Sequence, residues 1–359
     1  MNNFNKIPYM LLRGGTSKGP CFDWKYFPEN DVERNKILLS IMGSPHPLQI
    51  DGIGSNHDLA NKICLIRPSK LENIDVEYLL CQNHANSDQI ETNLDCGNML
   101  SAVAIYSLEM NYIKILKKET VLNIFSHNSK SRIEATISTK NKKINYEPDN
   151  IDNFEYGCIV KLAFLNPSGS SLGSEFPTGN KIDIIENTPV SCIDVSMPMV
   201  IGLAEDFNIS GNETKIELDR NHNLMKKLET IRRIAASKMG MGNVEYKTSP
   251  KICLVSKAIR NGHINARYFI SPFENNSHPT FAVTGAMCLG GSICIQNTLT
   301  NKLLKNFTIN DEENNISIEH PSGTINVSVY LDNKKNISKI SYLKSARPLS
   351  IGHVLIPKK

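Results

Sequence analysis

Two segments of this chain, Gly97–Met110 and Gly285–Leu299, have the spacing of helices but carry apolar or small residues nearly all round. A helix without a polar face needs other structure to enclose it. Each segment follows a strand-like run and a glycine-containing turn, and Gly97 and Gly285 lie 188 positions apart (285 minus 97), about half of the 359 residues. This spacing predicts a duplicated fold in which each half wraps a sheet round one central helix. Two unrelated buried helices are the alternative.

The rest of the chain is typical of short strands, with period-two alternation and polar Asn, Asp, Gly or Ser stretches between them. The predicted strands are 62–66, 121–125, 131–137, 157–164, 251–255, 263–269 and 324–330. Two amphipathic segments, Asp31–Met42 and Asn223–Met239, predict the remaining helices.

We therefore expect an α+β protein with two lobes. The first covers residues 1–184, with its central helix starting near Cys96, and the second covers residues 185–359, with its central helix starting near Thr284. The sequence leaves open whether the last strand of the chain returns to the sheet of the first lobe.

Charge and composition argue against nucleic-acid and membrane roles. Forty Lys and Arg against 36 Asp and Glu leave a formal charge of +4, and the basic runs are no longer than doublets, whereas nucleic-acid binders concentrate basic residues. The uncharged stretch 275–301 is interrupted by glycines and falls short of the roughly 18 apolar residues of a membrane span.

Nine cysteines without a CxxC pair or a signal-like start predict free thiols and a cytoplasmic location. Because the histidines and cysteines lack metal-ligand spacing, we expect no metal.

Cys96 and Lys62 are the strongest candidates for chemistry. Cys96 opens the first enclosed helix, where unpaired N–H groups and the helix dipole favour a thiolate and can also bind a carboxylate. An inert core cysteine is the alternative. Lys62 precedes a short apolar run; pointing inward it would be desolvated and suited to act as a base, and pointing outward it would be an ordinary strand-edge charge.

The segment Arg13–Gly19 combines glycines, hydroxyl groups and two cations. It lacks the residue order of a phosphate-binding loop, but it suits a carboxylate clamp because arginine binds such groups through two donors. A plain turn is the alternative. Arg267, and His278 near the second central helix, are further polar candidates.

In combination, these segments resemble the methylaconitate isomerase and 4-oxalomesaconate tautomerase family, which has the diaminopimelate epimerase-like fold. The matching segments, in family order, are 13–19, 42–45, 49–54, 95–98, 177–180, 284–286 and 319–323. Three further segments are most similar to the 4-oxalomesaconate tautomerase branch: 192–198, 204–206 and 229–232.

The resemblance implies two pseudo-symmetric lobes, each a mostly antiparallel sheet round a central helix, with the substrate between the starts of the two helices. It implies an isomerase without cofactor that performs a 1,3-proton shift on a small unsaturated di- or tricarboxylate. Lys62, Cys96 and Ser17 are the implied catalytic residues; we favour Lys62 as base and Cys96 as acid, although the direction is open. The expected substrate-binding residues are Arg13, Thr16, Gly97, Asn98, Arg267, His278, Thr284, Gly285 and Ser322.

Several alternatives stay open. Epimerases of this fold use one cysteine from each lobe, but Ala282 occupies the second position, which argues against a racemase. Ala60 and Asn61 stand where many relatives have Thr-Ser, and this leaves the substrate open: 4-oxalomesaconate is expected first, with aconitate, 2-methylaconitate and methylitaconate as alternatives. The non-enzyme alternative is an accessory protein of an aconitase-like enzyme. The small polycarboxylate is the expected partner, with neither nucleic acid nor membrane, and a homodimer stays open.

Overall fold

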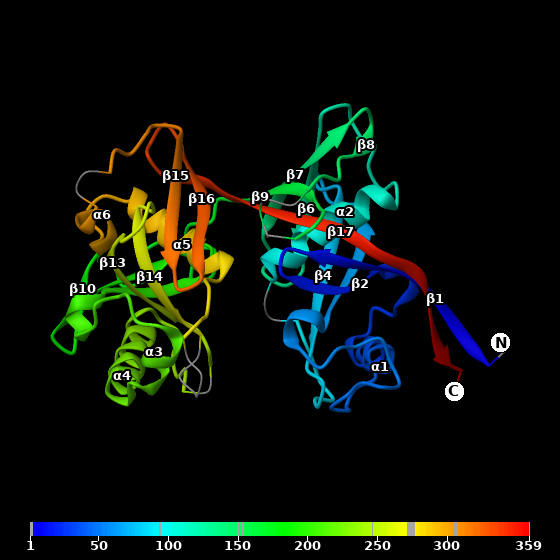
Figure 1. Cartoon of the computed structure of the whole chain (residues 1–359), viewed down its shortest axis with the longest axis horizontal. Helices are drawn as coiled ribbons and strands as arrows, with labels where there is room; N and C mark the ends of the chain where they lie inside the picture. Colours follow the sequence, from blue (N-terminus) through cyan, green and yellow to red (C-terminus); the bar gives the residue numbers. More distant parts are fainter. Residues whose placement is uncertain are drawn as a thin grey trace. The chain divides into compact units, whose positions relative to one another are not determined.

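The computed structural model describes residues 3–92, 95–148, 151, 154–245, 247–270, 277–304 and 307–358. It divides into two compact units (Figure 1): unit 1 is Met1–Ala163 with Leu343–Lys359, and unit 2 is Phe164–Tyr342. The chain therefore passes from one unit to the other twice, within strand β9 and again within strand β17. Among the described residues, no helix is both long enough and apolar enough to cross a membrane.

In unit 1, the strands form a closed ring of pairings round helix α2. The elements are β1 (Phe4–Gly14), β2 (Ser17–Asp23), α1 (Asp31–Met42), β3 (Lys62–Pro68), β4 (Val76–Asn83), β5 (Ile90–Glu91), α2 (Gly97–Glu109), β6 (Glu119–Ser126), β7 (Arg132–Lys140), β8 (Lys143–Ile144), β9 (Cys158–Leu165) and β17 (Ile337–Pro357). Along β1-β2-β3-β4-β6-β7 the pairs alternate antiparallel, parallel, antiparallel, parallel, antiparallel. β9 pairs with β7 and β17, and β17 pairs with β1, which closes the ring.

Unit 2 repeats this order. Its elements are β10 (Asp183–Ile185), β11 (Thr188–Asp194), β12 (Pro198–Leu203), α3 (Lys215–Arg220), α4 (His222–Lys238), β13 (Lys251–Lys257), β14 (Ile264–Phe269), α5 (Val283–Cys294), α6 (Leu299–Leu303), β15 (Glu313–His320) and β16 (Gly323–Leu331). Along β11-β12-β13-β14-β15-β16 the pairs show the same alternation of directions. α5 follows β14 as α2 follows β4 and β5, so the duplication predicted from the two apolar helices is present.

The two central helices are enclosed, as their composition predicts. Every residue of α2 from Met99 to Leu108 is buried, and so is every residue of α5 from Gly285 to Cys294. Burying a leucine or isoleucine side chain contributes about 1.5–3 kcal/mol, so these helices are fixed by the cores of their units. The N-terminus of each helix is consequently a rigid place to hold a ligand.

One predicted element is wrong in extent. The segment 285–299 is not a single helix, because α5 ends at Cys294 and Ile295 has extended backbone. The Thr298 hydroxyl donates to the Ser292 carbonyl at 2.7 Å and accepts from the Asn301 amide at 3.2 Å. A single threonine thus binds the end of α5 and caps the start of α6. The predicted helices 31–42 and 223–239 are confirmed as α1 and, within one residue at each end, α4.

Candidate active site

Ser17 and Cys96 meet at the start of α2. Ser17 is the first residue of β2, and Cys96 is the N-cap of α2, with extended backbone and no capping hydrogen bond from its side chain. The Ser17 Oγ lies 3.9 Å from the Cys96 Sγ. Ser17 is buried and Cys96 is partly exposed, so the thiol is accessible beside a fixed hydroxyl.

Asn98 holds this hydroxyl in place. Its Nδ2 donates to the Thr16 Oγ at 3.0 Å and to the Ser17 Oγ at 3.3 Å. Because both hydroxyls accept from the amide, each keeps its own proton to donate elsewhere. The Ser17 proton can therefore be donated to the Cys96 sulfur or to a bound oxygen atom. Gly15, at φ +50°, lets the turn approach closely, since a Cβ there would lie 2.3 Å from the Asn98 Oδ1.

Lys62 lies at the same end of the neighbouring strand. In the parallel β2–β3 pair, Cys21 is opposite Cys64, which sets Gly19 beside Lys62. The two backbones are so close that a Cβ on Gly19 would lie 1.7 Å from the Lys62 carbonyl oxygen. The Lys62 ammonium donates to the side-chain oxygen of Gln82, its cross-strand neighbour on β4. Its acceptor is thus a neutral amide rather than a carboxylate.

The turn into α2 is anchored by a buried network. The Tyr78 hydroxyl and the Ser126 hydroxyl both donate to the Asp95 Oδ1, the latter at 2.6 Å. Burial raises the pKa of Tyr78 well above its usual range, and the neighbouring Asp95 charge raises it further, so that Tyr78 stays a neutral donor. These contacts fix the residue directly before Cys96.

Cys96 differs from the other cysteines. All nine are free thiols within the described residues, and the eight others are buried. Burial raises the pKa of Cys81 and of Cys158 to about 12, which keeps these thiols protonated and inert. The partly exposed Cys96 is the one suited to reaction.

Arg13 is engaged within unit 1. Its guanidinium donates to the Gly15 carbonyl at 3.0 Å, to the Ser345 Oγ at 2.9 Å and to the Tyr156 carbonyl at 2.9 Å, and it stacks on Phe154. Arg13 is 7% exposed. These contacts tie the β1–β2 turn to β17.

Arg267 is held in a similar way in unit 2. It lies on β14, 4% exposed, and donates to the Glu213 carbonyl at 2.8 Å, the Asn265 side-chain oxygen at 2.9 Å and the Ala266 carbonyl at 3.0 Å. Burial lowers its pKa from the usual arginine value. The contact with Glu213 ties β14 to the segment before α3, whereas Asn265 and Ala266 belong to β14 itself.

The hydrogen bonding of His278 defines which ring nitrogen carries the proton. Its Nδ1 accepts from the Thr280 backbone N–H at 3.0 Å, and burial lowers its pKa. The ring is therefore neutral at pH 7, and the hydrogen-bond pattern assigns its proton to Nε2. The ring packs edge-on against Tyr268, with centroids 6.0 Å apart.

Thr284 and Gly285 lie in the first turn of α5, whose N-cap is Ala282. Gly285 is buried against Tyr268, where a Cβ would meet the ring at 2.5 Å. The Ser322 hydroxyl donates to the Pro279 carbonyl at 2.6 Å and so braces the segment before the helix. Ala282 and Cys96 thus occupy the same position at the starts of the two central helices, and unit 2 has no thiol there.

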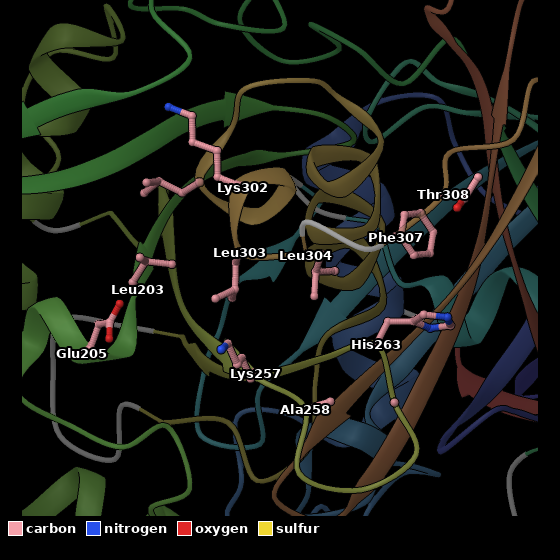
Figure 2. Close-up of a pocket in the computed structure, with 12 residues that line it drawn as sticks. Leu203, Glu205, Lys257, Ala258, His263, Lys302, Leu303, Leu304, Phe307 and Thr308 are labelled. Atoms are coloured by element: carbon pink, nitrogen blue, oxygen red, sulfur yellow. The ribbon is translucent and has the colours of Figure 1, made fainter.

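Unit 2 also contains a pocket of about 1040 Å³ (Figure 2). It is lined at its apolar side by Leu203, Leu299, Leu303, Leu304 and Phe307. Its wall includes Lys257, the last residue of β13, whereas Tyr268 and Gly285 lie near the beginning of that strand. Tyr268 is opposite Cys253, and the four residues from Cys253 to Lys257 span about 13 Å. None of the predicted site residues of unit 2 is among the described residues that line this pocket.

Comparison with known proteins identifies the family. The family model described as PrpF protein matches residues 4–357. The chain belongs to the PrpF protein family. It is 36% identical to the putative isomerase YbhH of Escherichia coli K12 over 98% of this chain and 99% of that protein. It is 32% identical to the 4-oxalomesaconate tautomerase of Pseudomonas putida over 98% of this chain and 96% of that protein.

The crystal structure of a methylitaconate-delta-isomerase superposes with a TM-score of 0.87 at 26% identity, covering 99% of this chain and 96% of that one. The predicted family and the diaminopimelate epimerase-like fold class are thereby confirmed. This PrpF family member is an isomerase, like the named relatives.

Gln82 and the Tyr78–Ser126–Asp95 network were missed by sequence reasoning. Gln82 matters because it is the cross-strand neighbour of Lys62, and this pairing requires the β3–β4 register. β4 is buried at seven of its eight positions, so it lacks the alternation that marks a strand with one exposed face. The available signal was the apolar run within Val76–Asn83, which follows the Lys62 strand after a short polar segment.

Proposed function

We propose that this isomerase moves a proton between two carbons, 1,3-related, of a small unsaturated di- or tricarboxylate without a cofactor. The first candidate reaction is the tautomerisation of 4-oxalomesaconate, because the relative from Pseudomonas putida carries that name. The observation that carries the proposal is the contact of Ser17 with the partly exposed Cys96 at the start of α2, beside the strand that begins with Lys62.

In the proposed reaction, neutral Lys62 removes a proton from the carbon next to a carboxylate or carbonyl group. The electron pair of that C–H bond spreads into the conjugated system as a dienolate. Cys96 then donates its proton to the carbon two positions away, and the double bond shifts. A proton returned from the Lys62 ammonium to the Cys96 thiolate, directly or through solvent, restores both groups, so the overall reaction is balanced.

The start of α2 supports the charged intermediate. The N–H groups of a first helical turn point along the positive end of the helix dipole, and Gly97 and Asn98 supply them here. The Ser17 hydroxyl, which keeps its proton because Asn98 donates to it, adds a further donor. Positioned acid–base groups typically contribute about 10²–10⁴-fold in rate, and fixed dipoles directed at the developing charge contribute the rest.

In unit 1, we propose Thr16, Gly97 and Asn98 as direct substrate contacts. In unit 2, taken by itself, His278, Thr284 and Gly285 are the proposed carboxylate-binding residues. Arg13, Arg267 and Ser322, which donate to backbone carbonyls of their own units, act in this proposal as positioning residues. This revises their expected role as substrate ligands.

Proton NMR in heavy water tests the proposal. Wild type is incubated separately with 4-oxalomesaconate, methylitaconate, 2-methylaconitate and cis-aconitate, beside Cys96→Ser and Lys62→Ala. We expect isomerisation of at least one compound by wild type, with a loss of at least 100-fold in each variant. Cys81→Ala and Lys257→Ala, a buried thiol of unit 1 and an exposed lysine of unit 2, are the matched controls and should retain activity. Full activity in Cys96→Ser or Lys62→Ala would contradict the assignment.

A further inference from the structure

β13 repeats the start of β3. Both strands begin with Lys-Ile-Cys-Leu, at Lys62 and at Lys251, and their seven residues have the same burial pattern: a half-buried lysine followed by four buried residues. Each strand lies between a parallel neighbour and an antiparallel neighbour, β2 and β4 in unit 1 and β12 and β14 in unit 2. Lys251 is therefore the counterpart of Lys62 in sequence and in the sheet.

Both lysines make the same kind of contact. Lys62 donates to the side-chain oxygen of its cross-strand neighbour Gln82. Lys251 donates to the carbonyl oxygen of Ile270, which directly follows Phe269, the partner of Ile252. Each acceptor is neutral and uses one of three ammonium protons, so that, within the described part of the chain, two protons of each lysine can be donated to a ligand.

Burial and a neighbouring cation both act on the charge of Lys251. Burial, together with the nearby cation Arg232 of α4, lowers the pKa of Lys251 to about 8. Arg232 is itself paired with Glu229 at 2.7 Å, and the neighbour on β12 is the apolar Met199. Among the acidic side chains in the described part of the chain, none lies within 4 Å of the Lys251 ammonium. A half-buried cation beside a second cation is favourable when a ligand provides the counter-charge.

Lys251 also lies on the face of the sheet that α5 covers. Residues two apart on a strand share a face, so Lys251 is on the side of Cys253, which is opposite Tyr268. Tyr268 contacts Gly285 in the first turn of α5 and packs against His278. The charge of Lys251 is near enough to His278 to help lower the pKa of that histidine, after burial and beside Lys215; Lys215 is paired with Asp219.

We propose that Lys251 binds a carboxylate group, and that the His278 Nε2–H and the first N–H groups of α5 complete this anion site in unit 2. The identification of that carboxylate as part of the substrate rests on the proposed function, whereas the anion site itself does not. Lys62 and Lys251 would then be duplicated lysines with different tasks, one moving a proton and the other binding a charge.

The test measures binding of tricarballylate, a saturated tricarboxylate that cannot undergo the proton shift. Titration calorimetry at pH 8.5, in two buffers of different ionisation enthalpy, gives the affinity and the number of protons taken up. With a pKa of about 8, Lys251 is about one-quarter protonated at pH 8.5, and a bound carboxylate favours the charged form. We expect wild type to take up a substantial fraction of a proton, up to about three-quarters, from this site.

Lys251→Met should bind tricarballylate at least 10-fold more weakly and lose that proton uptake. Lys251→Arg should keep most of the affinity but lose the uptake, because arginine stays charged at this pH. Lys257→Met, at the far exposed end of the same strand, should behave as wild type. If Lys251→Met fails to fold, judged by circular dichroism, Lys251→Arg alone decides.

Unchanged proton uptake in Lys251→Arg, unchanged affinity and uptake in a folded Lys251→Met, or no binding by wild type would overturn the anion site. Failure of the proposed function looks different: wild type would bind tricarballylate with Lys251-dependent uptake and yet isomerise none of the polycarboxylates.

Discussion

Replacing Gln82 with glutamate tests whether Lys62 acts in its neutral form. The Lys62 ammonium donates to the Gln82 side-chain oxygen, and this carboxamide is held by its own donation to the Asn61 carbonyl at 3.3 Å and the Asn83 carbonyl at 3.2 Å. Gln82→Glu therefore puts a carboxylate against the ammonium with little change of shape. It also removes the amide donors, so the new carboxylate turns toward the lysine.

A hydrogen bond between charged groups contributes about 1.5–3 kcal/mol. If Lys62 has to lose its proton before it can act, this stabilisation of the ammonium is added to the barrier. At about 1.4 kcal/mol for each tenfold in rate, kcat/KM should fall roughly 10- to 150-fold at pH 7.5, and the rising limb of kcat/KM against pH should move to higher pH. Initial rates between pH 6 and 10 on the substrate identified by NMR measure both effects.

Gln89→Glu is the matched control. It adds the same charge at an exposed position directly before β5, the strand that pairs with the end of β4, and it should leave the dependence of kcat/KM on pH unchanged. Gln82→Met removes the acceptor without adding a charge and separates the loss of the hydrogen bond from the ion pair. If Gln82→Glu retains wild-type kcat/KM and the same pH profile, Lys62 does not act as a neutral base, and the proposed roles of Lys62 and Cys96 have to be exchanged or abandoned.

Two further variants test residues that hold others in place: Asn98 beside Ser17 in unit 1, and Glu319 in unit 2. Asn98→Ala removes the donors to Thr16 and Ser17 and should lower kcat at least about 10-fold with a small change in melting temperature, because misplacement of a catalytic group costs rate more than stability; unchanged kcat in a folded variant would refute the positioning role. Glu319 accepts from the backbone N–H groups of Ile259, Arg260 and Gly262 at 2.8–2.9 Å; burial alone would raise its pKa, but these donors and the Arg260 charge outweigh it and lower the pKa. Glu319→Gln should cost about 2 kcal/mol or more of unfolding free energy at pH 7 by urea titration. Since a lowered carboxylate pKa stabilises above the unfolded pKa and this contribution is lost as pH falls, the deficit should shrink toward pH 3; an equal deficit at both pH values would contradict the assignment.

The features that sequence predicts well here are those with local causes. α1 begins after Asn30, whose side chain accepts from the Glu33 amide, and ends at Gly43, which has left-handed backbone; both signals are visible in the residues themselves. The two central helices can be predicted because their segments lack a polar face. The start of the first segment at Gly97 then places Cys96 at a helix N-terminus. Such features depend on a few neighbouring residues.

The features that sequence does not supply depend on pairing across long separations. Arg13 looks like a ligand clamp among its neighbours, yet its guanidinium binds Ser345, which is 332 positions away. Gln82 becomes part of the site through the β3–β4 register. The split between α5 and α6 depends on Thr298 binding back to Ser292, a choice that apolar composition does not reveal. The Lys-Ile-Cys-Leu repeat was visible in the sequence, but its meaning follows from the matching positions of β3 and β13.

The central claim is that Lys62 removes the proton and Cys96 returns it two carbons away. Deuterium exchange in heavy water at each carbon of the substrate, followed by NMR with each variant, tests it most directly. The account predicts that Cys96→Ser still exchanges the hydrogen at the donating carbon while forming product at least 100-fold more slowly, and that Lys62→Ala loses exchange and product formation together. Exchange that persists in Lys62→Ala but is lost in Cys96→Ser would contradict it.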